Sequence, residues 1–427
     1  MPDLQYCPAF KPGLAFFPSP GLDPAAQAAL AGLDGERETE ALIQGVLAAH
    51  GFWAAAEARY ALRICELGTK LDYAVLHEGA RIAWLCPLNG DFQLQRGRTG
   101  GRLSRFACLR RDGRALVCES PLAGVRVEFE PAAAAGLSGL LSGDGEDPVV
   151  RLLGEAGLLE TEGENRPPAE FWEFHDLLFH GASRRHAGRR VGATFRFQGR
   201  LESPPAVKPP LSPQGIPLNK PTSKETETGF QDVLERRRSR REPGPRPITL
   251  AKLGEFLYRS VAIRQRFAGG PQELLLRPYP SGGAIHELEF YIAVHQCEGL
   301  ETGLYHYHAE EHALYRLRSD EGRLRELIGT ALISWGGAYP TPNLFVTIAA
   351  RLPRLAWKYE GMAYRIILLN AGAALQTMYL VATAMGLAPC AVGNGDPGLF
   401  RALTGIDPME ETSVAEFTLS SAAAGGR

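Results

Sequence analysis

The sequence lacks paired cysteines, a targeting segment and an excess of charge of one sign. Its seven cysteines form no Cys-x-x-Cys pair, so we expect reduced thiols in the cytoplasm rather than a disulfide framework. The N-terminus has no basic region followed by an apolar core, which argues against a signal peptide. The net charge is −2 at pH 7, so the composition gives no reason to expect a nucleic-acid partner.

Long apolar runs free of polar residues are also missing. The longest apolar stretch, residues 364–385, contains Arg365, Asn370 and Gln376. Burying a charged side chain in lipid is costly. The stretch is therefore predicted to be a buried core helix, and no membrane partner is expected.

A chain of 427 residues exceeds the size at which one core keeps growing, so two or three domains are expected. The clearest boundary is a stretch with seven prolines, residues 201–222. Proline fixes φ and removes a backbone donor, so this segment should run extended outside helices and central strands. We predict a proline-rich linker over residues 197–228.

The first half predicts small mixed modules. Asp112 and Gly113 lie between two apolar runs and indicate a hairpin, and residues 125–129 alternate as a third strand. Helical patterns follow at residues 148–159 and 169–180. Short strands followed by short helices favour two winged-helix-like modules, at residues 1–100 and 101–196.

The second half, residues 229–427, alternates strands and helices more regularly. Thr249 and Asp320 are predicted to begin helices, and Gly386 is predicted to end the long helix over residues 360–385. Strands are predicted near residues 286–295, 303–317, 344–349, 388–393 and 413–419, with a helix at 397–404. The pattern predicts an α+β domain with one dominant buried helix beside a sheet.

Two motifs in this half carry candidate binding chemistry. Residues 236–241 place five arginines and a serine together, and guanidinium groups are suited to a phosphate dianion. The alternatives are a solvated basic patch or a nucleic-acid contact. Residues 277–284 lead into a strand through Ser281, Gly282 and Gly283, and the glycines allow close approach of the backbone to a flat ring or a phosphate. A plain turn is the alternative there.

These two motifs, in this order and followed by a long helix and a glycine-rich segment, resemble those of the FMN-dependent nitroreductase superfamily. The resemblance implies a nitroreductase-like FMN domain over residues 229–427, with FMN held at a homodimer interface. The superfamily's further basic residues near the C-terminus are not evident here, so phosphate binding should depend mainly on the arginines. The residues that the resemblance assigns to the FMN site are Arg237, Arg238, Ser239, Arg241, Pro280, Ser281, Gly282, Gly283, Asn370, Gln376, Gly393 and Asn394.

Within the superfamily the chain resembles the peptide azoline oxidases, on residues 277–289, 303–307 and 357–359, with a cyanobactin-type resemblance at 171–180. These enzymes dehydrogenate thiazoline and oxazoline rings in ribosomally made peptides to thiazoles and oxazoles. The resemblance implies hydride transfer to flavin N5, reoxidation by O₂, winged-helix-like peptide-binding modules ahead of the oxidase domain and possible association with a cyclodehydratase. It places the base at Lys358 and Tyr359.

The chemistry of the Lys358-Tyr359 pair is sensible independently of the family. A neighbouring ammonium should lower the pKa of the Tyr359 phenol, which is otherwise a poor base near neutral pH. Alternatively, Lys358 donates to the azoline nitrogen and Tyr359 takes the carbon-bound proton. Adjacent residues point to different faces of regular elements, so this model requires an irregular backbone at 358–359.

Other interpretations stay open from the sequence. The chain could be an NAD(P)H-dependent flavin reductase acting on nitro or quinone compounds, or a non-catalytic peptide-binding scaffold. The spacing of His306, His308 and His312 invites a metal-site interpretation, but Glu310 and Glu311 lie in the turn between them and no metal site is predicted.

Overall fold

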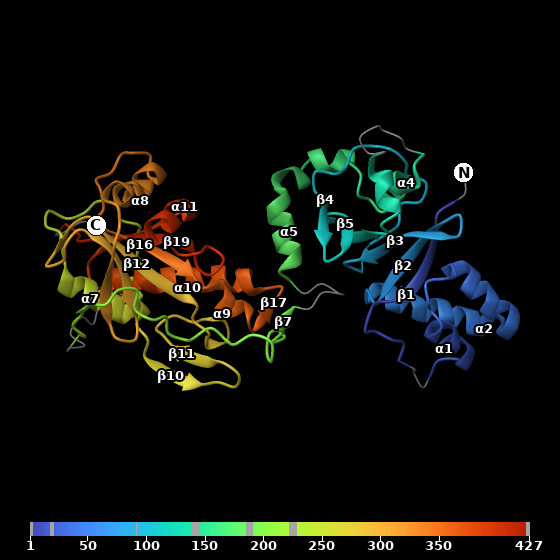
Figure 1. Cartoon of the computed structure of the whole chain (residues 1–427), viewed down its shortest axis with the longest axis horizontal. Helices are drawn as coiled ribbons and strands as arrows, with labels where there is room; N and C mark the ends of the chain where they lie inside the picture. Colours follow the sequence, from blue (N-terminus) through green and yellow to red (C-terminus); the bar gives the residue numbers. More distant parts are fainter. Residues whose placement is uncertain are drawn as a thin grey trace. The chain divides into compact units, whose positions relative to one another are not determined.

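The computed structural model describes residues 3–17, 21–90, 92–138, 146–184, 191–221 and 229–423. The chain divides into two compact units, Met1–Val191 and Gly192–Arg427, which are described separately (Figure 1).

The first unit contains a six-stranded antiparallel sheet in the order β1-β2-β3-β6-β5-β4. The predicted module boundary at residue 100 falls inside this sheet, because β3 pairs with β6. The predicted hairpin is formed by β4 and β5, whose ends meet at Gly113 (φ 60°). The strands are β1 (Gln5–Phe10), β2 (Leu71–His77), β3 (Ala80–Pro87), β4 (Cys108–Asp112), β5 (Ala115–Ser120) and β6 (Val125–Phe129).

Helices flank this sheet. The longest, α2, is broken at Gly51 (φ 85°, ψ 179°), a conformation that glycine adopts at little steric cost. Leu152 and Leu153 of α4 pack with Leu85 and Val127 of the sheet. The winged-helix assignment of this unit stays a prediction. The helices are α1 (Pro24–Ala31), α2 (Thr39–Leu67), α4 (Pro148–Glu155) and α5 (Phe174–Ala182).

The second unit is built on a seven-stranded antiparallel sheet in the order β18-β19-β16-β12-β14-β15-β8. The strands are β8 (Gly215–Pro217), β12 (Leu288–Val294), β14 (Gly303–His308), β15 (Ala313–Leu317), β16 (Leu344–Ala350), β18 (Ala388–Val392) and β19 (Thr412–Ser420). Shorter strands lie outside it: β7 (Gly192–Ala193), β9 (Ile248–Thr249), β10 (Gln265–Ala268), β11 (Glu273–Leu276), β13 (Cys297–Glu298) and β17 (Tyr359–Glu360).

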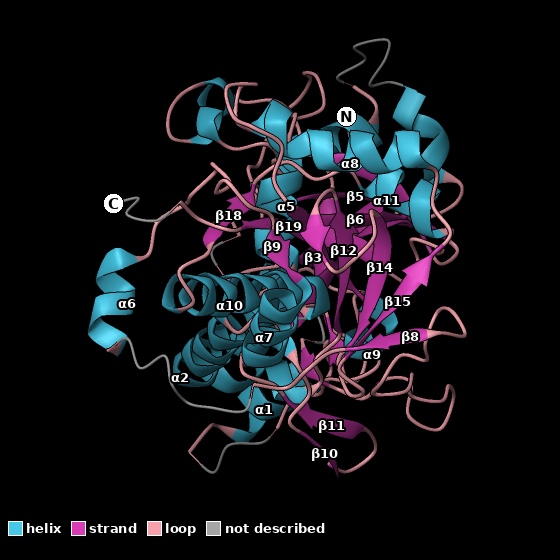
Figure 2. Ribbon diagram, turned by 90° about the vertical axis from the view of Figure 1, so that its left-hand side faces the viewer, coloured by secondary structure: helices cyan, strands magenta, loops and turns pink. Residues whose placement is uncertain are grey.

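Helices cover both faces of the second sheet, with α7 and α10 on one side and α8 and α11 on the other (Figure 2). Alternate residues of β12 divide accordingly: Phe290 and Ile292 pack toward α10, while Tyr291 and Ala293 pack toward α8. Thr249 and Asp320 accept backbone hydrogen bonds at the starts of α7 and α8, as predicted. The helices are α6 (Phe230–Arg236), α7 (Leu250–Val261), α8 (Glu321–Ser334), α9 (Leu352–Ala356), α10 (Ala363–Ala384) and α11 (Pro397–Thr404).

The helix α10 is long and apolar enough to cross a membrane by length and composition. In the structure its Ile367, Ala371, Ala374 and Met378 lie in the core against α7 and the sheet. The long apolar stretch is therefore a core helix of the second unit, as predicted.

The proline-rich stretch runs extended along the second unit. Its strand β8 extends the sheet edge beside β15, where the missing proline donor is tolerated. The carbonyl of Pro204 accepts a hydrogen bond from Arg354, and Lys208 pairs with Glu411 at 2.6 Å. The described part of the predicted linker, residues 197–221, is thus packed against this unit, whereas residues 222–228 lie outside the described residues.

Candidate active site

The candidate residues gather in two clusters along α10. The turn cluster comprises Ser281, Gly282, Gly283, Glu287, Lys358, Tyr359 and Asn370. The arginine segment, residues 237–241, lies near Tyr379 of α10. Asn370 and Tyr379 are nine residues apart, so they lie about 14 Å apart along the helix axis and on opposite sides of it.

The turn between β11 and β12 has a strained backbone. Gly283 has φ 61°, and the non-glycine residues Ala284 and His286 have φ 57° and 50°. A Cβ atom on Gly282 would lie 2.5 Å from Ile366 Cγ2 of α10, so the first glycine is needed for the close approach of turn and helix. Such strain persists only where the surroundings enforce it, and it is common at functional sites.

A buried polar network holds this turn against α10. The Asn370 side-chain carbonyl accepts a hydrogen bond from Gly282 N at 3.0 Å. Its amide donates to the two carboxyl oxygens of Glu287 at 2.9 and 3.1 Å and to Ser281 Oγ at 3.1 Å. Burial raises the pKa of Glu287, and these hydrogen bonds oppose that rise. Asn370 therefore fixes the turn from inside the protein.

Lys358 and Tyr359 meet at the glycine of this turn. They follow α9, with Lys358 in a turn and Tyr359 opening β17, so the backbone is irregular there, as the catalytic hypothesis requires. A Cβ atom on Gly283 would lie 2.5 Å from Lys358 Nζ and 2.6 Å from Tyr359 Oη. Both polar atoms thus point to one place beside the strained turn.

The pKa of the Tyr359 phenol is shifted in the direction opposite to the one predicted from the sequence. Burial raises the pKa of Tyr359, whereas a lowering by Lys358 was predicted. The Lys358 ammonium lies 5.4 Å from the centre of the Tyr359 ring. Removing a phenolate from water is costly, and desolvation decides the direction here. The resting side chain is a neutral phenol.

The arginine segment is held on the aromatic ring of Tyr379. The guanidinium of Arg237 lies 5.3 Å from the ring centre, and Ser239 Oγ lies 2.8 Å from the Tyr379 hydroxyl. Arg241 lies over the ring of Tyr339, and its buried Nε has no hydrogen-bond partner among the described residues. Arg238, just past the end of α6, instead donates to the carbonyls of residues 235 and 237.

The remaining candidate residues are on the surface of the second unit. Pro280 precedes the strained turn, Gln376 lies on the outer side of α10, and Gly393 and Asn394 follow β18. All four are exposed. They belong to neither hydrogen-bonded cluster described above, and their assignment to a cofactor remains a prediction.

Three contributing residues were not identified from the sequence. Glu287 completes the Asn370 network, Tyr379 anchors Ser239 and accepts a hydrogen bond from Ala391 N at 2.7 Å, and Phe195 lies beside Lys358. The position of Glu287, just after the glycine turn, was the available signal for it. Phe195 lies far from Lys358 in the sequence, and no local pattern indicates their contact.

The three histidines have separate partners. His306 pairs with Glu289 at 3.2 Å, His308 accepts from Glu311 N, and His312 is hydrogen-bonded to Tyr307. In the described part of the chain, no group of three or more His, Cys, Asp or Glu side chains is arranged to hold a metal ion.

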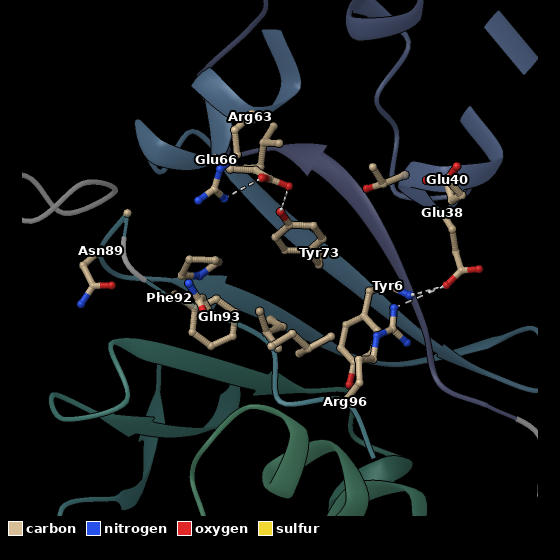
Figure 3. Close-up of a pocket in the computed structure, with 16 residues that line it drawn as sticks. Tyr6, Glu38, Glu40, Arg63, Glu66, Tyr73, Asn89, Phe92, Gln93 and Arg96 are labelled. Atoms are coloured by element: carbon tan, nitrogen blue, oxygen red, sulfur yellow. Dashed lines mark hydrogen bonds and ion pairs between the residues drawn. The ribbon is translucent and has the colours of Figure 1, made fainter. Parts of the chain in front are cut away.

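The first unit has a cavity of about 620 Å³ between α2, strands β1 to β3 and the segment that follows β3 (Figure 3). Tyr6 and Tyr73 lie in its walls, with Arg96 4.5 Å from the centre of the Tyr6 ring and Glu66 accepting from the Tyr73 hydroxyl. Apolar side chains complete the lining, among them Leu71, Leu85, Phe92 and Leu94. The cavity combines an apolar floor with ion-paired groups at its edge.

Comparison with known proteins places the second unit in a family. Residues 234–417 match the Nitroreductase family. The protein MJ1384 of Methanocaldococcus jannaschii, which bears the name nitroreductase, is 32% identical over 167 residues, covering 39% of this chain and 79% of MJ1384. The family match, residues 234–417, contains both clusters.

One further relative and one solved structure are also similar to this chain. The trifolitoxin-processing protein TfxB of Rhizobium leguminosarum bv. trifolii is 26% identical over 150 residues, which are 34% of this chain and 40% of TfxB. A chain of the E. coli microcin synthetase McbBCD complex, solved with truncated pro-MccB17 bound, is 18% identical with a TM-score of 0.36. That match covers 54% of this chain and 88% of the other.

Proposed function

The chain belongs to the nitroreductase family, and we propose that it is an FMN-dependent oxidase that converts azoline rings in a peptide to azoles. The observation that supports this proposal most is the convergence of Lys358 Nζ and Tyr359 Oη at Gly283. Azoline dehydrogenation needs a base for the proton that leaves carbon, whereas a reductase of nitro compounds or quinones needs a proton donor but no base.

The residues of the second unit suit FMN. In the part of the chain that the structure describes, the buried Nε of Arg241 has no hydrogen-bond partner, and unpaired buried donors are costly unless a ligand satisfies them. Arg237 and Ser239, close by on Tyr379, add donors suited to a phosphate. Bound FMN would supply a two-electron acceptor.

Lys358 and Tyr359 would divide the acid and base roles. The Lys358 ammonium donates to the azoline nitrogen, which makes the ring C–H more acidic. Tyr359 first releases its phenol proton to solvent, and the phenolate then takes the carbon-bound proton. A raised pKa makes the Tyr359 phenolate scarcer but a stronger base when formed. This favours the role in which Lys358 donates to the azoline nitrogen over the role in which it lowers the pKa of Tyr359. A more acidic ring C–H can be deprotonated by a weaker or scarcer base.

The substrate is proposed to be a peptide, anchored in part by the first unit. TfxB, whose name refers to trifolitoxin processing, supports a processing role. The cavity of the first unit has the apolar floor and polar edge that side chains of a peptide segment require. Remote binding of this kind can position the reacting ring. Association with a cyclodehydratase and a cytoplasmic location remain part of the proposal.

A homodimer is proposed to complete the cofactor site. The two clusters lie on opposite sides of α10, so a second copy could bring its arginine segment to the first copy's turn cluster. The outer face of α10 exposes Tyr364, Leu368 and Leu369, an apolar surface suited to a symmetric contact. Light scattering on the purified protein would measure the mass directly, and a monomer at micromolar concentration would contradict this part.

The decisive experiment uses purified protein and a thiazoline-containing peptide, without nicotinamide. We expect a yellow protein and loss of two hydrogens from the peptide, seen by mass spectrometry. The name of MJ1384 supports one rival, a nicotinamide-dependent reductase of nitro compounds or quinones. NADH consumption without peptide, and no change in the peptide's mass, would favour that rival and refute the oxidase.

A further inference from the structure

A short segment ahead of the proline-rich stretch is fastened to the Lys358-Tyr359 turn. This strap, residues 192–201, begins with β7, which pairs antiparallel with β17 (Figure 1). Phe195 N donates to the Lys358 carbonyl at 3.1 Å. The strap is thus bonded through its backbone to both residues proposed to act on the substrate.

Side chains fasten the strap on either side of Phe195. Thr194 Oγ1 donates to Glu360 at 2.9 Å, and Arg196 lies 3.8 Å from the other carboxylate oxygen of Glu360. Farther along, Trp357 Nε1 donates to the carbonyl of Leu201 at 2.8 Å. These contacts surround the residues flanking Lys358 and Tyr359, so the strap and the turn form one local unit.

The ring of Phe195 is placed by this fastening. It packs edge-on against Trp357, with 6.0 Å between the two ring centres. The Lys358 ammonium lies 5.7 Å from the centre of the Phe195 ring. An ammonium within about 6 Å of an aromatic centre is attracted to the ring. Phe195 has φ 51°, an uncommon conformation for a bulky residue that the surrounding bonds must maintain.

We propose that Phe195 is a positioning residue, which holds the Lys358 ammonium beside Gly283 in the geometry that the substrate ring requires. The proposal rests on the proposed oxidase function. Four rotatable side-chain bonds separate the ammonium from the Lys358 backbone, so the backbone bond from the strap alone leaves it mobile. The centres of the Phe195 and Tyr359 rings lie 5.7 and 5.4 Å from Nζ, and both rings restrict the ammonium.

The test compares Phe195→Leu with Phe197→Leu in the full-length protein. Phe197 is in the same strap, but its ring contacts Arg196 and Arg200. For Phe195→Leu we expect normal FMN content, a kcat for azoline oxidation lowered about tenfold or more, and a KM changed little. Phe195→Tyr should restore kcat, and Phe197→Leu should stay within about twofold of the parent.

A second readout does not depend on turnover. Lys358 would be labelled with an amine-acylating reagent and quantified by peptide mass mapping against the exposed Lys252. We expect faster labelling of Lys358 in Phe195→Leu and an unchanged rate in Phe197→Leu. If Phe195→Leu does not fold, Thr194→Val loosens the same strap through one hydrogen bond and should give a smaller increase.

The outcomes separate the two proposals. Unchanged kcat and unchanged labelling in Phe195→Leu would overturn the positioning role. If the parent protein oxidises no azoline peptide, the proposed function fails, and the labelling alone then decides the role of Phe195. Equal loss of kcat in both leucine variants would also count against it, because a general loosening of the strap would explain the result.

Discussion

The two clusters beside α10 are built in different ways. The turn cluster joins a strained, partly exposed turn to a buried asparagine amide and a buried carboxyl group that satisfy one another. The arginine segment lies nearer the surface and is held on the rings of Tyr379 and Tyr339, and the buried Nε of Arg241 has no hydrogen-bond partner among the described residues. The turn cluster is thus organised without a ligand, and under the proposed function the phosphate of FMN would complete the arginine segment. Substitutions in the two clusters should therefore affect different steps.

The largest effect is expected from Tyr359→Phe. This variant lacks the Tyr359 hydroxyl beside Gly283, which is the proposed proton acceptor. General base catalysis typically contributes about 100-fold or more to the rate. Azoline oxidation should fall by that factor while flavin absorbance stays normal. Tyr60→Phe, an exposed tyrosine of the first unit, serves as the control. Near-normal oxidation by flavin-loaded Tyr359→Phe would show that the base has been assigned wrongly.

Gly283→Ala should separate positioning from stability. The new Cβ would displace Lys358 Nζ and Tyr359 Oη, and Gly283 has φ 61°. The matched control is Gly270→Ala, because Gly270 has φ 78° and open space around its Cβ position. Both variants should lose about 1 kcal/mol of stability from the backbone. Only Gly283→Ala should lose about tenfold or more in kcat. Equal kcat values in the two variants would contradict the claim that Lys358 and Tyr359 act on the substrate beside Gly283.

Arg241→Ala tests the other cluster. Losing a charged hydrogen-bond donor should weaken FMN binding about tenfold, measured by fluorescence titration of the apoprotein. Arg236→Ala removes an equal charge nearby, from the last turn of α6, and should change the affinity less. The kcat at saturating FMN should be preserved in Arg241→Ala. A fall in kcat with unchanged FMN affinity would reverse the roles assigned to the two clusters.

The smallest effect concerns the pH dependence of stability. Burial raises the pKa of Glu287, so its contribution is fully present below the ordinary carboxyl value of 4.5 and is lost as pH rises through the folded-state pKa. Burial also raises the pKa of Glu416 to about 7, so the comparison is made in a Glu416→Gln background. Urea unfolding from about pH 4 to about pH 8 should show a flatter profile for Glu287→Gln. An unchanged profile would mean that Glu287 ionises as readily in the folded protein as in the unfolded chain.

Much of the second unit was predictable because its signals are local. Thr249 and Asp320 cap helices with their own side chains, and Gly386 supplies the positive φ that ends α10. The central strands β12 and β16 are short, mostly apolar runs that are buried along their whole length. The first unit was predicted less completely. The pairing of β3 with β6 joins distant segments, and short strands carry little information about which strand they will pair with.

For the candidate site, the sequence by itself determined which residue types were present and their order: an arginine segment, a glycine turn, a Lys-Tyr pair and a long helix. The tertiary structure decided how they are grouped. It joined Asn370 to Glu287 and Gly282, set Phe195 beside Lys358, and left the arginine segment on the far side of α10. It also reversed the expected shift of the Tyr359 pKa, because burial depends on the packing of distant segments and the neighbouring lysine does not compensate for it.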